Sequence, residues 1–113
     1  MVYQADEADK ALTVIMEMLD KCIRIQPKFA KNTAPYTLLK NRIKALTIAG
    51  SLLAGRTVKD DYQPDELAAA WLPLSFIIRK CQKAQLKHDL KSRTYRQLQE
   101  MIAALSYAEA LIR

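Results

Sequence analysis

Residues 43–53 read IKALTIAGSLL, and residues 102–112, which lie 59 positions later, read IAALSYAEALI. The two stretches carry Ile, Ala, Leu, Ala and Leu at the same five places, and Thr47 is matched by Ser106. In each stretch the apolar residues recur at three- and four-residue steps, which is the spacing of one face of an α-helix. They therefore predict two equivalent amphipathic helices.

The match covers the whole chain when the sequence is shifted by 59 residues without a gap. Of the 54 aligned pairs, 16 are identical, against roughly three or four expected by chance for a composition of this kind. The identities include the pairs Tyr3-Gln4 with Tyr62-Gln63, Asp6-Glu7 with Asp65-Glu66, and Lys21-Cys22 with Lys80-Cys81. We therefore expect a single domain, 1–113, made of two tandem repeats, 1–54 and 60–113.

Each repeat is predicted to fold as two helices joined by a short link. The expected helices lie near residues 6–26, 35–54, 64–86 and 92–112. Pro64 opens the third helix, Asn32 or Thr33 is the candidate N-cap of the second, and Ser92 is that of the fourth. Gly55 follows the second helix, where a left-handed cap is common. The predicted fold class is all-α, an antiparallel four-helix bundle built from two tandemly duplicated helical hairpins with a pseudo-two-fold axis.

The composition supports this class and excludes others. The 113 residues hold only two glycines and four prolines, too few for the many tight turns of a β-sandwich or barrel. The longest apolar run, 68–78, is broken by Pro73 and Ser75, and a membrane span needs about 18–20 residues. The first residues are acidic and lack the apolar stretch of a secretory signal. We therefore expect a cytoplasmic protein with no membrane partner.

The net charge of +6 is unevenly distributed along the chain. Residues 21–59 contain nine Lys or Arg and no acid, and residues 79–96 contain seven with Asp89 as the one acid. The acids gather elsewhere, at Asp6, Glu7, Asp9, Asp60, Asp61, Asp65 and Glu66. Part of this pattern fits the helix dipole, because cations stabilise helix C-termini and anions N-termini.

The hairpin links at 27–34 and 86–91 are both basic. In the predicted bundle they lie at one end, which makes that end a candidate for binding nucleic acid or another polyanion. The candidate anion-binding residues are Lys28, Lys31, Lys87, Lys91 and Arg93.

The helices also carry more apolar residues than one stripe requires. A bundle helix needs about three apolar positions per heptad, and the excess predicts exposed patches that a two-fold dimer would cover. The candidate self-association surface consists of Leu38, Ile48, Trp71 and Phe76. The alternative is a broad apolar stripe buried within the monomer.

No motif indicates catalysis or metal binding. Cys22 and Cys81 occupy equivalent places in the two repeats but lack the spacing of a disulfide framework or a zinc site, and we interpret them as packing residues. We expect no catalytic residues, no metal and no cofactor. The expected function is that of a small non-enzymatic helical bundle acting through protein–protein interaction. The alternative is non-specific binding of nucleic acid or another polyanion at the basic end.

Overall fold

Four α-helices make up most of the chain, as predicted. The computed structural model describes residues 2–56, 58 and 61–112, and within these it contains no strand. The helices are α1 (Val2–Ile25), α2 (Ala34–Leu53), α3 (Pro64–Gln85) and α4 (Arg93–Ile112), and a 3-10 turn, η1 (Gln26–Lys28), follows α1. Helices α2 and α4 begin and end 59 residues apart, the same offset as the sequence repeat.

The first helix begins earlier than predicted. It starts at Val2 rather than near residue 6, so its first turn contains no acid. Glu7 and Asp9 therefore lie beyond the first turn, where they have little effect on the unpaired amides of the helix start. The expectation that these acids complement the helix dipole was wrong for α1.

The helix ends follow the local chemistry of the sequence. Thr33 caps α2, with its hydroxyl oxygen accepting a hydrogen bond from Tyr36 N at 3.4 Å, and Ser92 accepts the equivalent bond from Tyr95 N at 3.1 Å. These two caps and the two tyrosines they bind are again 59 residues apart. Gly55 has a φ of +80° after α2, the left-handed conformation that glycine adopts without a Cβ penalty. The predicted caps are confirmed.

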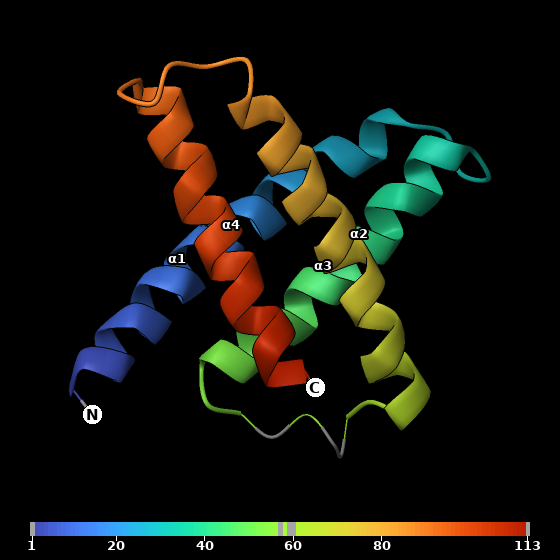
Figure 1. Ribbon diagram of the computed structural model, residues 1–113. Helices are drawn as coiled ribbons and strands as arrows, with labels where there is room; N and C mark the ends of the chain where they lie inside the picture. The colour runs from blue at the N-terminus through green and yellow to red at the C-terminus, as the bar shows by residue number, and fades with distance from the viewer. Residues whose placement is uncertain (1, 57, 59–60, 113) are drawn as a thin grey trace.

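The two hairpins cross each other rather than lying side by side (Figure 1). The hairpin of α1 and α2 runs from lower left to upper right, and the hairpin of α3 and α4 runs from lower right to upper left. The molecule is correspondingly flat, with extents of 40 × 40 × 21 Å. Helices α2 and α4 contact each other at the crossing, while no contact joins α1 and α3 among the described residues. Helices α2 and α4 are therefore central, and α1 and α3 flank them.

The core lies at this crossing and draws on all four helices. Its largest fully buried side chains are Ile15, Leu46, Ile48, Leu74 and Leu105. The central helices also bury small residues, namely Ala45, Ala49, Ala104 and Ala108. Small side chains let two helix backbones approach closely, and the large apolar ones contribute about 1.5–3 kcal/mol each on burial.

Across the described residues, no helix combines the length and the apolar character needed to cross a membrane.

Candidate functional site

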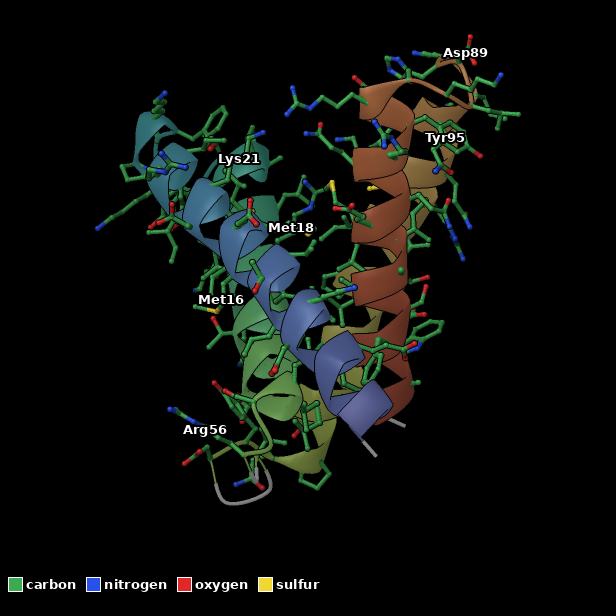
Figure 2. All side chains as sticks on the ribbon, turned by 90° about the vertical axis from the view of Figure 1, so that its left-hand side faces the viewer. Met16, Met18, Lys21, Arg56, Asp89 and Tyr95 are labelled. Atoms are coloured by element: carbon green, nitrogen blue, oxygen red, sulfur yellow. The ribbon has the colours of Figure 1, made fainter. Side chains whose placement is uncertain are left out.

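The five candidate anion-binding residues are all exposed. Lys28 ends the 3-10 turn and Lys31 lies in the first link, whereas Lys87 and Lys91 lie in the second link and Arg93 begins α4. Both links are on the same side of the molecule, at the top of Figure 1, but the crossing of the hairpins places them apart. The view in Figure 2 also shows the hairpins diverging toward their links. The fold thus forms two basic tips on one side instead of a single cluster.

The lysines and arginine of these tips are not neutralised by neighbouring acids. The ion pairs found among the described residues are Arg24–Asp20, at 3.2 Å, and Lys44–Glu66. Asp89 lies within the second tip, but its Oδ1 accepts a hydrogen bond from Lys91 N at 3.0 Å, which shapes the turn. The tips therefore remain net positive.

The acidic residues lie mostly away from the tips. Figure 1 shows the N-terminus and the link after α2 at the bottom, opposite the basic links. Glu7 and Asp9 belong to the first of these regions, and Asp61, Asp65 and Glu66 belong to the second. Asp60 and the side chain of Asp6 lie outside the described residues.

Three apolar side chains on the tips are exposed, and two of them, Leu86 and Leu90, were missed in the sequence. Leu86 and Leu90 are 87% and 71% exposed, and Phe29 is 38% exposed. Their positions in polar links between Lys residues were the available signal, because an apolar residue in such a link has no helix face to bury it.

Only part of the candidate self-association surface is exposed. Leu38 and Phe76 are about half exposed and Trp71 is half-buried, but Ile48 is fully buried. The inclusion of Ile48 was wrong, because α2 contacts α1, α3 and α4 and therefore buries a wider stripe than a bundle helix with two neighbours. Leu72, which was not among the candidates, is 52% exposed and lies one turn before Phe76. The Arg79 guanidinium lies 6.0 Å from the centre of the Phe76 ring.

The two thiols have environments that disfavour ionisation. Burial raises the pKa of Cys22 and of Cys81 above the ordinary value, and the charge of Arg42 opposes this shift at both. Both thiols therefore stay protonated at neutral pH, the unreactive form of cysteine. Among the described residues, no three His, Cys, Asp or Glu side chains form a group that could hold a metal ion.

A groove of about 700 Å³ lies between α1 and α4. Its charged lining residues are three glutamates and one lysine: Glu7, Glu17, Glu100 and Lys10. The apolar lining residues are Ala11, Val14, Ala103, Ala104 and Tyr107, of which Ala11 and Ala104 are buried. The groove is thus acidic at its rim and apolar at its floor, in a chain that is positive overall.

A second groove, of about 350 Å³, lies between α2 and α3. It is lined by Asn41, Lys44, Ala45, Asp65, Glu66, Ala69, Ala70, Leu72 and Pro73. Eight of these nine residues are 59 residues from a described residue that lines the first groove, and the counterpart of the ninth, Asp65, is Asp6, whose side chain lies outside the described residues. The two grooves therefore occupy equivalent places in the two halves.

An ion pair spans the second groove. Lys44 Nζ of α2 donates a hydrogen bond to Glu66 Oε2 of α3. This bond holds the pKa of Lys44 above its ordinary value and that of Glu66 below, with the Gln63 backbone N–H also lowering the pKa of Glu66. In the first groove Glu7 stands at the place of Glu66, but Ala103 stands at the place of Lys44. The difference between Lys44 and Ala103 is visible in the sequence, but only the fold shows that both residues line a groove.

No protein family, curated protein or solved structure matches this chain.

Proposed function

We propose that the protein is a non-enzymatic module that acts by binding another protein. The observation that carries this proposal is the apolar pair on α3, Leu72 and Phe76, which lie one helical turn apart and are each about half exposed. Exposed phenylalanine and arginine side chains, such as Phe76 and the neighbouring Arg79, are enriched in protein–protein interfaces. A second copy of the chain is one partner that this surface could take, with Leu38 as a further contact.

The proposal can be tested with two matched variants. Phe76→Ser removes the aromatic member of the apolar pair, and Ile23→Ser removes an equally exposed apolar residue of α1. Sedimentation at micromolar concentration measures self-association, and affinity capture from the native host with and without nuclease measures other partners. The proposal is supported if the association resists nuclease, is abolished by Phe76→Ser and is retained in Ile23→Ser. Association that is equally strong in both variants contradicts it.

Polyanion binding through the two basic tips is the second candidate function. It is favoured by the exposure of all five cationic residues and by the position of both tips on one side of the molecule. Contacts between lysines and phosphates weaken steeply as salt rises, because binding releases counterions. Replacing Lys31, Lys91 and Arg93 together with Ala should then reduce retention on heparin or DNA while the unfolding transition stays unchanged. Absence of retention at low salt would remove this candidate.

We also infer that the chain is a duplicated antiparallel helical hairpin. The support is the recurrence of the 59-residue offset in the bounds of α2 and α4, in the caps Thr33 and Ser92, and in the lining of the two grooves. The pattern of helix contacts agrees, since α1 contacts α4 as α3 contacts α2. An experimental structure in which α1 and α2 do not superpose on α3 and α4 would contradict this inference.

A further inference from the structure

The second groove shows which chemical group fits a glutamate at its position. Glu66 accepts a hydrogen bond from the ammonium of Lys44, which reaches across from α2. The aliphatic stem of that lysine belongs to a groove whose other lining residues include Ala45, Ala69 and Ala70. A glutamate at this position of the groove is therefore complemented by an ammonium group on an aliphatic stem, and in the second groove Lys44 of the same chain provides that group.

The first groove has the same acid but lacks the internal cation. Ala103 leaves open the space that a lysine would cross, and the groove has about twice the volume of its counterpart, about 700 against 350 Å³. Glu7 has no ion-pair partner among the described residues. Glu17 and Glu100 add two carboxylates, and Lys10 is the single cation among the described residues of the lining. Charge complementarity thus favours a cationic occupant.

The shape of this groove favours a helix as that occupant. Its lining runs along α1 from Glu7 to Glu17, a distance of about 15 Å at the rise of an α-helix, or nearly three turns. Two helices with an apolar floor between them form a place where a third amphipathic helix can lie. A short amine would fill only part of this length.

We propose that the groove between α1 and α4 binds a lysine-bearing amphipathic helix of a partner protein, with a lysine ammonium against Glu7. The proposal rests on the proposed function as a protein-binding module and names a second docking surface with the chemistry of its partner. The lysine stem and small apolar residues of the partner lie over Val14 and Ala103. Glu17 and Glu100 then face further cations along the same helix.

The test uses a synthetic helical peptide of about three to four turns, made of Ala, Leu and Lys, and the same peptide with its lysines acetylated. Titration calorimetry should show binding of one peptide to the wild-type chain, weakened by salt and reduced about tenfold or more by acetylation, as expected for loss of a charge pair. Equal binding of the two peptides would overturn the proposal.

Two reciprocal variants locate the site. Ala103→Lys should supply the missing cation to Glu7 and abolish binding, and Lys44→Ala should open the second groove and raise the stoichiometry from one peptide to two. Ala103 and Lys44 are exposed, so the fold should tolerate both changes. Glu7→Gln provides a further variant that should weaken binding without filling the groove. The proposal would be overturned if Ala103→Lys and Glu7→Gln bound the peptide with unchanged affinity. It would also be overturned if Lys44→Ala still bound only one peptide.

A final variant separates this inference from the proposed function. Phe76→Ser leaves the lining of the first groove intact, so its peptide titration should match that of the wild type. If the peptide does not bind but Phe76-dependent association persists, the groove proposal alone fails. If the peptide binds while Phe76-dependent association is absent, the proposed α3 surface alone fails.

Discussion

The two central helices share three core positions and differ at the groove positions near them. Ala45, Leu46 and Ala49 of α2 correspond to Ala104, Leu105 and Ala108 of α4, and all six are buried. Directly before this stretch and one turn before it, Lys44 and Asn41 of α2 correspond to Ala103 and Glu100 of α4, and these line the two grooves. Close packing fixes size and polarity at the crossing, whereas the groove positions can differ in charge at little cost to the fold. The halves thus share one core and present two different surfaces.

The largest expected effect comes from truncating the shared core. Leu46→Ala and Leu105→Ala each remove a fully buried side chain and should each lower the free energy of unfolding by about 2–5 kcal/mol. Urea denaturation followed by circular dichroism measures both values. Leu38→Ala, at a site 46% exposed, is the control and should cost much less. A large effect in one half and a small one in the other would break the equivalence of the two core positions.

The two N-caps provide a weaker test of the same equivalence. Thr33→Ala and Ser92→Ala each remove the oxygen that accepts a hydrogen bond from the amide three residues later. Each change should cost about 1 kcal/mol of unfolding free energy, with a range of about 0.5–2. The Ser92 bond is the shorter of the two, at 3.1 against 3.4 Å, so its loss should cost at least as much. If thermal or urea unfolding showed a larger loss of stability for Thr33→Ala than for Ser92→Ala, the two cap hydrogen-bond lengths would not explain the difference.

A smaller effect, of opposite sign, is expected at Gly50, where the halves differ because its counterpart is Glu109. Gly50 is buried inside α2, and a Cβ built there meets Met16 Sδ at an ordinary contact distance of 3.5 Å. Gly50→Ala should therefore raise the free energy of unfolding by about 0.5–1 kcal/mol, because alanine loses less backbone entropy in a helix. Destabilisation measured by urea unfolding would show that this site is too crowded for a methyl group.

The smallest effect concerns the ion pair that distinguishes the grooves. Because the pKa of Glu66 is lowered, the pair contributes fully above about pH 4.5, the ordinary pKa of glutamate, and the contribution is lost as the pH falls through the lowered pKa. Because the pKa of Lys44 is raised, the pair contributes fully below about pH 10.5, the ordinary pKa of lysine, and the contribution is lost as the pH rises through the raised pKa. The difference in melting temperature between wild type and Glu66→Gln should therefore be small, because the pair is exposed, and should shrink at both extremes. Glu7→Gln, the equivalent change, removes no ion pair found among the described residues and is the control. Matching profiles for the two variants would show that the grooves do not differ in this way.

The sequence predicted the helices well because their signals are local. Apolar spacing located the four helices, and Thr33, Ser92, Gly55 and Pro64 marked their ends through hydrogen bonds or backbone angles within a few residues. Among the helix bounds, the start of α1 was the clear error, since the acids near residue 6 that were taken to mark it lie beyond the first turn. The basic links were likewise evident from the sequence, because each is a short segment whose residues stay exposed in most helical arrangements.

The structure alone decided which faces are buried. Periodicity describes one helix at a time and cannot show that α2 touches all three others, which is why Ile48 was assigned to the surface and lies in the core. The crossing of the hairpins also separated the two basic tips and brought Glu7 of α1 beside Ala103 of α4 in one groove. The sequence by itself determined the four helices, their caps and the charge of the links. Only the tertiary structure decided the crossing and hence the grooves, because helix packing depends on side chains that are distant in the chain.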